Sequence, residues 1–150
     1  MLIQMKVEGL LFDPRSGMYI LLLQQVNGDG TLPIWIGKPE ADSIALAIGK
    51  VVTPRPLTHD LIKTVFDSLE VKAHRVVITE IVENTYYALI YVYDGKKEIT
   101  IDSRPSDAVA VALRAQVPIF VEEGVLEVRK ADELEEWLKN LKPEDFGNIM

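Results

Sequence analysis

The sequence has no cysteine among its 150 residues. This absence excludes disulfide bonds, thiolate metal sites and cysteine nucleophiles, and it fits a reducing compartment. No apolar run approaches the ~18 residues that a membrane-spanning helix needs. The first residues, Met1 to Lys6, lack the basic start and the long apolar stretch of a signal peptide. We therefore expect a cytoplasmic protein that makes no membrane contact.

Several catalytic sequence motifs are also missing. The chain has no P-loop, GxGxxG, HExxH or GxSxG pattern, so kinases, Rossmann dehydrogenases, zincins and serine hydrolases have no support. Basic residues are in the minority, and the formal net charge is −7. Because nucleic-acid binding relies on Lys and Arg to neutralise phosphates, this charge argues against tight nonspecific binding. A divalent cation would be a natural bridge between an acidic protein and a nucleic acid.

The chain does contain enough apolar sequence for one folded domain. Hydrophobic residues make up 48% of it, and a chain of this length buries roughly two-thirds of the surface that its unfolded form exposes. Apolar alternation and turn signals such as Asn27-Gly28 and Asp94-Gly95 predict strands, and apolar residues at helical spacing predict helices. The predicted strands cover residues 6–12, 18–25, 32–36, 75–82, 86–93, 98–101 and 118–121. The predicted helices cover residues 39–48, 58–69, 105–114 and 132–141.

The two halves of the chain repeat one order of elements. Each half has a strand, a turn, a second strand, an Asp-Gly turn, a short strand, a basic residue followed by proline, and an Ala-rich helix. We therefore predict a duplicated β-β-β-α unit. The fold class that follows is α+β, with a mixed, largely antiparallel sheet and helices packed on one side. An amphipathic C-terminal helix is added to this domain.

A basic residue precedes proline at three points where a helix is about to begin. The three junctions are Lys38-Pro39, Arg55-Pro56 and Arg104-Pro105. Proline suits the first helical turn, because its missing N–H group would lack an intrahelical partner there. Helix N-termini also present unpaired N–H groups and a partial positive charge. The three junctions therefore predict places where a phosphate or a carboxylate is gripped.

The segment Asp102 to Asp107 is the densest polar cluster between apolar segments. In a structural interpretation, Ser103 or Ser106 caps the helix, Asp107 complements its dipole and Arg104 neutralises an aspartate. In a functional interpretation, Asp102 and Asp107 are oxygen ligands for Mg²⁺ or Mn²⁺, and Arg104 holds a phosphate. The sequence leaves both interpretations open.

The second polar cluster contains His59, one of only two histidines in the chain. It falls in a first helical turn, where an imidazole can serve as a general acid or base. The alternative is an exposed residue at the start of a helix. Glu40 and Asp42 flank the first predicted helix N-terminus, and complementation of the helix dipole accounts for both.

Together these clusters resemble the bifunctional nuclease family of small bacterial proteins with plant relatives. The resemblance covers the stretch from Lys6 to Val125, and the residues from 132 onward lie outside it. We accordingly divide the chain into a nuclease-like domain, residues 1–129, and a C-terminal helical appendage and tail, residues 130–150. The matching segments are Pro33-Ile34-Trp35-Ile36-Gly37 with Glu40-Ala41, Arg55-Pro56-Leu57-Thr58-His59-Asp60-Leu61, Ile101-Asp102-Ser103-Arg104-Pro105-Ser106-Asp107-Ala108 and Pro118-Ile119-Phe120-Val121.

The resemblance implies cleavage of both RNA and DNA. Our hypothesis assigns His59 to proton transfer, Arg55 and Arg104 to the scissile phosphate, and Asp107 to catalysis as well as metal binding. The predicted ligands of the divalent metal, Mg²⁺ or Mn²⁺, are Asp102, Asp107, Asp60 and Glu40.

The competing hypothesis is a non-catalytic module that binds a partner protein or a small anionic ligand. An apolar face on the C-terminal helix would then mediate self-association, and we predict a homodimer. The same face packing on its own domain is the alternative. The residues of this face are Leu134, Trp137, Leu138 and Leu141.

Overall fold

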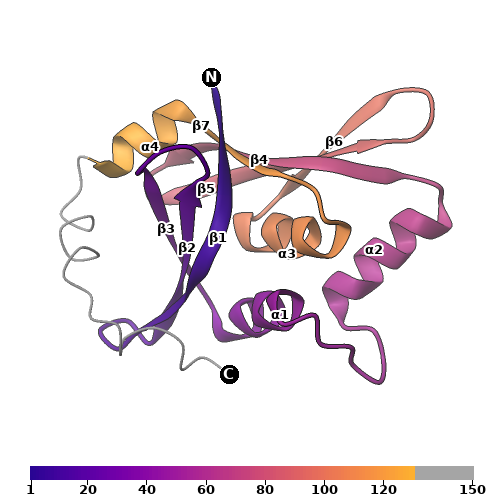
Figure 1. Ribbon diagram of the computed structural model, residues 1–150, viewed down its shortest axis with the longest axis horizontal. Helices are drawn as coiled ribbons and strands as arrows, with labels where there is room; N and C mark the ends of the chain where they lie inside the picture. Colours follow the sequence, from indigo (N-terminus) through magenta and orange to yellow (C-terminus); the bar gives the residue numbers. More distant parts are fainter. Residues whose placement is uncertain (131–150) are drawn as a thin grey trace.

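A strongly bent seven-stranded sheet forms the centre of the molecule, as the computed structural model of residues 1–130 shows (Figure 1). Its strands are β1 (Leu2–Asp13), β2 (Met18–Gln25), β3 (Thr31–Ile36), β4 (Lys72–Val82), β5 (Thr85–Tyr93), β6 (Glu98–Ser103) and β7 (Ile119–Glu122). The helices of this part of the chain are α1 (Lys38–Ile48), α2 (Thr58–Ser68), α3 (Pro105–Ala115) and α4 (Glu123–Lys130).

The strand order β3-β2-β1-β7-β4-β5-β6 reveals two halves joined by one strand. Strands β1 to β3 form one antiparallel meander, and β4 to β6 form the other. Between them, β7 pairs antiparallel with β1 and parallel with β4. Each meander leads into a helix, α1 in the first half and α3 in the second. The arrangement agrees with the predicted β-β-β-α repeat, and the predicted α+β class with a largely antiparallel sheet is confirmed.

Helices α1, α2 and α3 lie together in the angle of the bent sheet, whereas α4 lies apart from them beside β7 and β4 (Figure 1). Helix α3 is the most deeply buried, because a continuous run from Ala108 to Ala112 has almost no exposed surface. Its small side chains let α1 and α2 pack closely against it. The main core is continuous from the first meander to the second, so the halves form one folding unit.

The structure extends several predicted strands, β1 and β4 the most, and adds one helix. Strand β1 begins at Leu2 because residues 2–5 pair with β7, and β4 begins at Lys72 because it pairs with β5. Helix α4 was not predicted, and its Val125 and Leu126 are buried in the core. The predicted helix over residues 132–141 and its apolar face lie outside the described residues. Within residues 1–130, no helix has the length and apolar composition needed to cross a membrane. The homodimer stays a prediction.

Candidate functional site

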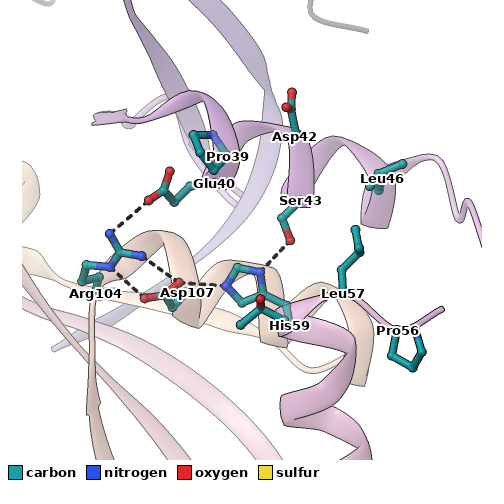
Figure 2. A pocket seen from close by; sticks show the side chains of 11 residues that line it. Pro39, Glu40, Asp42, Ser43, Leu46, Pro56, Leu57, His59, Arg104 and Asp107 are labelled. Atoms are coloured by element: carbon teal, nitrogen blue, oxygen red, sulfur yellow. Dashed lines mark hydrogen bonds and ion pairs between the residues drawn. The ribbon is translucent and has the colours of Figure 1, made fainter. Parts of the chain in front are cut away.

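The beginnings of α1, α2 and α3 surround a pocket with a volume of about 570 Å³ (Figure 2). All three basic-proline junctions lie at these helix starts, as the sequence predicts. Two prolines and two leucines give the pocket an apolar wall. Its polar lining includes Glu40, Asp42, Ser43, His59, Arg104 and Asp107. The pocket therefore brings together four of the seven predicted site residues: His59, Arg104, Asp107 and Glu40.

Arg104 joins the second half of the molecule to the first. Its Nε donates to Asp107 Oδ2 at 2.8 Å, and its Nη2 donates to Asp107 Oδ1 at 3.2 Å. Its Nη1 donates to Glu40 Oε1 on α1 at 3.1 Å. The Arg104 side chain is 64% exposed, so solvent and ligands reach it. These contacts bear out the Arg104–Asp107 pair of the structural interpretation, but no serine side chain caps α3, whose N-cap residue is Arg104 itself.

Asp107 is ionised in this arrangement. Partial burial works against its charged form, yet the hydrogen bonds from Arg104 and His59 outweigh that effect and lower the pKa of Asp107 below 3.8. The same carboxylate, followed by Glu40, raises the pKa of Arg104. An ionised carboxylate only accepts hydrogen bonds, so Asp107 fixes the hydrogen position on the imidazole beside it.

His59 is buried rather than exposed, which rules out the alternative that it is a solvent-facing residue of a helix start. The residue has 7% exposure. Its Nε2 lies 2.8 Å from Asp107 Oδ1, and its Nδ1 lies 2.6 Å from Ser43 Oγ. The imidazole thus links α1 to α3 from its own position on α2 (Figure 2).

Sequence reasoning missed two residues that complete this cluster, Ser43 and Arg114. Ser43 lies in the middle of α1 and is 8% exposed. Arg114, near the end of α3, donates from Nη2 to the Ser43 carbonyl and to Ser43 Oγ, both at 3.2 Å. A serine inside a helix and an arginine in a last turn are ordinary at those positions, so no sequence signal marks either of them.

Asp60 faces away from the pocket although it follows His59 in the sequence. Its Oδ1 accepts a hydrogen bond from Arg114 Nε at 2.7 Å, and its Oδ2 accepts one from the Leu57 backbone at 2.9 Å. The hydrogen bond from Arg114, followed by that from Leu57, lowers the pKa of Asp60. Asp60 therefore acts in the described structure as the ion-pair partner that ties α2 to α3.

Arg55 and Asp102 are exposed, and neither lines the pocket. Of the four predicted metal ligands, only Glu40 and Asp107 reach the same site, where both are held by Arg104. Glu40 Oε2 is buried and has no hydrogen-bond partner within residues 1–130. Across those residues, no group of three or more His, Asp or Glu side chains is arranged to hold a metal ion. The predicted four-ligand set does not fit the structure, and dependence on Mg²⁺ or Mn²⁺ stays a prediction.

Comparison with known proteins identifies the family. The bifunctional nuclease domain matches residues 21–133. An uncharacterized protein of Mycobacterium tuberculosis (strain H37Rv) is 39% identical across 95% of this chain and 97% of its own length. Bifunctional nuclease 1 of Oryza sativa subsp. indica and bifunctional nuclease 2 of Arabidopsis thaliana are each 30% identical, over 68% and 67% of this chain and 32% of their own lengths. The match thus spans about a third of each plant protein. This chain belongs to the bifunctional nuclease domain family.

Proposed function

We propose that the protein is a nuclease that hydrolyses phosphodiester bonds of RNA and DNA in the pocket between α1, α2 and α3. The observation that supports this most is the His59 imidazole, held by the ionised Asp107 at 2.8 Å inside a pocket of about 570 Å³. A proton-transferring group fixed in one orientation beside an arginine is what phosphodiester hydrolysis needs. The names of the plant relatives, bifunctional nuclease 1 and bifunctional nuclease 2, point to the same activity.

Each charged group in the pocket has a distinct part in this proposal. His59 moves protons, and Asp107 holds its ring and stabilises the imidazolium form. Arg104 uses three hydrogen bonds within the described residues. A guanidinium has further N–H donors, which can face a phosphate oxygen. Arg104 is thus the group proposed to position the scissile phosphate.

The acidic groups of the pocket are largely neutralised by neighbours. Asp42 accepts a hydrogen bond from Lys38 Nζ at 2.7 Å, and Glu40 and Asp107 share Arg104. The chain as a whole has a formal net charge of −7. We therefore expect the protein to bind nucleic acid weakly and to lose that binding as the salt concentration increases. The apolar wall formed by prolines and leucines gives sugars and bases a surface to contact.

The test compares highly purified wild-type protein with His59→Ala and His74→Ala on end-labelled RNA and DNA oligonucleotides. His74 is the only other histidine, and it pairs with Glu98 at 2.8 Å outside the pocket. We expect His59→Ala to lose about 10²- to 10⁴-fold of the cleavage rate, whereas His74→Ala keeps it. All variants are purified identically, because contaminating nucleases are the main source of false activity.

Equal cleavage by wild type and His59→Ala would contradict the proposal. Binding of oligonucleotides without any cleavage would favour the non-catalytic module instead. Parallel reactions with EDTA, and then with Mg²⁺ or Mn²⁺ restored, test the metal prediction separately. A second variant, Arg104→Ala combined with Asp107→Asn, removes the phosphate-positioning group and the histidine partner together, and it should be inactive with an unchanged far-UV circular dichroism spectrum.

A further inference from the structure

Ser43, His59 and Asp107 form one hydrogen-bonded chain across three helices (Figure 2). Asp107 is ionised and accepts only, so His59 Nε2 carries the hydrogen of that 2.8 Å contact. A neutral imidazole has a hydrogen on one nitrogen alone, and its Nδ1 is therefore the acceptor. It follows that the Ser43 hydroxyl donates to Nδ1 across 2.6 Å. These hydrogen directions are those of the neutral imidazole, which is the form that can accept a proton from Ser43.

Both imidazole nitrogens are occupied, which restricts the proton that His59 can take. The proton already directed at Nδ1 is that of Ser43. A water molecule could reach Nδ1 only after displacing the serine, which is 8% exposed and anchored by Arg114. We propose that Ser43 is the nucleophile of the cleavage reaction and that the reaction passes through an intermediate in which Ser43 Oγ is esterified to the phosphate of one product nucleotide. This inference rests on the proposed nuclease function.

The surroundings of Ser43 match the needs of a nucleophile. A serine inside a helix ordinarily bonds back to a carbonyl of the preceding turn, whereas this one bonds to a histidine 16 positions away. Arg114 Nη2 donates to Ser43 Oγ at 3.2 Å and would stabilise negative charge that develops there. Ser43 also lines the same pocket as Arg104, and the proposal requires a phosphate held by Arg104 to come within reach of the Ser43 hydroxyl.

The constellation has the members of a Ser-His-Asp triad with the imidazole turned around. In the familiar triad, serine faces Nε2 and aspartate faces Nδ1. Here serine faces Nδ1 and aspartate faces Nε2. The roles are unaffected, because either nitrogen of imidazole accepts a proton while the other donates to a carboxylate. The missing GxSxG pattern excludes only a serine on a strand-to-helix elbow, and Ser43 lies within a helix.

The proposed reaction balances without a further reagent besides water. Ser43 Oγ attacks the phosphorus while its proton moves to His59 Nδ1, and the bond from phosphorus to one nucleoside oxygen breaks. In an in-line displacement the leaving oxygen lies opposite Ser43, so it takes its proton from a water molecule. His59 keeps the serine proton as an imidazolium that Asp107 stabilises. The hydroxide left by that water then attacks the phosphorus of the serine-linked nucleotide. The bond between Ser43 Oγ and phosphorus breaks as Ser43 takes its proton back from His59 Nδ1, and the second product leaves with a terminal phosphate.

The test uses the full chain with diisopropyl fluorophosphate, which reacts with activated serines without requiring a nucleic-acid substrate. Ser43 Oγ would displace fluoride at the phosphorus. We expect one adduct on the peptide that contains Ser43, and labelling at least 100-fold slower in His59→Ala. The matched control is Ser68, an exposed serine at the end of α2. The Ser68→Ala variant should label at the wild-type rate, and Ser68 itself should stay unmodified.

Cleavage assays run in parallel with the labelling distinguish the claim that Ser43 is the nucleophile from the claim that the protein is a nuclease. We expect Ser43→Ala to lose at least about 10³-fold of the cleavage rate, and the Ser43→Ala/His59→Ala double variant to lose no more than either single variant, because triad members act as a unit. Cleavage retained by Ser43→Ala, with no labelling, would overturn the nucleophile and leave the proposed function standing. Labelling of Ser43 with no cleavage would show an activated serine but overturn the nuclease function, and with it the role of Ser43 in cleavage.

A final arm covers the folding of the variants. Thermal unfolding shows whether Ser43→Ala is folded, and Ser43→Cys, with a nearly isosteric thiol, serves if it is not. A folded Ser43→Cys that reacts with iodoacetamide faster than Ser43→Cys/His59→Ala supports the activated position. Equal reactivity of the two would overturn it. Neither labelling nor cleavage in the wild-type protein would overturn both proposals.

Discussion

Replacement of Arg114 by methionine tests whether α1, α2 and α3 are held together as the structure shows. The Arg114 side chain is 9% exposed and reaches Asp60 on α2 as well as the Ser43 carbonyl and Ser43 Oγ on α1. Methionine keeps the apolar stem of the side chain and removes every N–H donor. The variant therefore isolates the hydrogen bonds from the packing.

The stability lost in Arg114→Met can be worked out from how exposed Ser43 and Asp60, the partners of Arg114, are. The hydrogen bonds to Ser43 share one nitrogen and come from a charged donor, so together they contribute about 2 kcal/mol. Asp60 is 36% exposed, and solvent screening limits its ion pair to about 1 kcal/mol. The expected loss in the free energy of unfolding is thus about 3 kcal/mol, which lowers the Tm by roughly 6–12 °C in a chain of this size.

The loss of unfolding free energy in Arg114→Met should also change with pH, in the direction that the pKa of Asp60 determines. The pKa of Asp60 is lowered below 3.8 chiefly by Arg114, so the pair stabilises the fold fully above that value. Its contribution disappears as the pH falls through the lower, folded-state pKa. We therefore expect the difference between wild type and Arg114→Met to shrink as the pH is lowered from 7 toward 3.

Urea unfolding followed by circular dichroism measures both effects. The midpoint should fall while the slope with denaturant stays unchanged, and Asp60→Asn combined with Arg114→Met should give a coupling energy of about 1 kcal/mol. A change below about 0.5 kcal/mol at pH 7 would match an ordinary surface substitution and would mean that Arg114 does not hold the three helices together. A difference that stays constant down to pH 3 would refute the role of Asp60.

Two further substitutions test the pocket itself. Asp107→Asn replaces the acceptor-only carboxylate by an amide and leaves the imidazole tautomer unfixed, so we expect the kcat of oligonucleotide cleavage to fall about 10⁴-fold. The control variant Asp67→Asn, which breaks the exposed ion pair with Lys63, should keep the wild-type rate. Equal rates for both variants would show that Asp107 is only structural. Gly37→Ala would place a Cβ 2.8 Å from Glu40 Oε2, so the flexible carboxylate should move off Arg104 and lower kcat/KM several-fold with a Tm near that of wild type. The control for Gly37→Ala is Gly124→Ala, where an added Cβ meets no atom within 4 Å. An unchanged kcat/KM in Gly37→Ala would mean that Glu40 has no part in positioning Arg104.

Local sequence signals predicted most elements of the fold because each depends on near neighbours. Turn residues and apolar periodicity located the two meanders and the three site helices within a few residues. The additional length of β1 was not predictable, because Leu2 to Met5 pair with β7 more than a hundred positions away. Helix α4 was missed for a similar reason, since burial of Val125 and Leu126 in the core, and not helix propensity, favours it.

The difference between features set by near neighbours in the sequence and features set by distant contacts also explains which site residues were found. The basic-proline junctions led to Arg104, Asp107 and His59 because they lie at helix starts. Ser43 was missed because only the packing of α1 against α2 and α3 gives it a partner. Asp60 was grouped with His59 by sequence, but adjacent residues of a helix point in different directions. Its carboxylate consequently faces Arg114 instead of the pocket.

The position of β7 has a consequence for how the protein matures. Glu40 and Ser43 belong to the first meander's helix, whereas Arg104 and Asp107 belong to the second. The strand that hydrogen-bonds the two meanders to each other is β7, near the end of the described chain. On the ribosome, both halves emerge before the strand that unites them. The sheet that carries the pocket helices is therefore completed only once synthesis has passed Glu122.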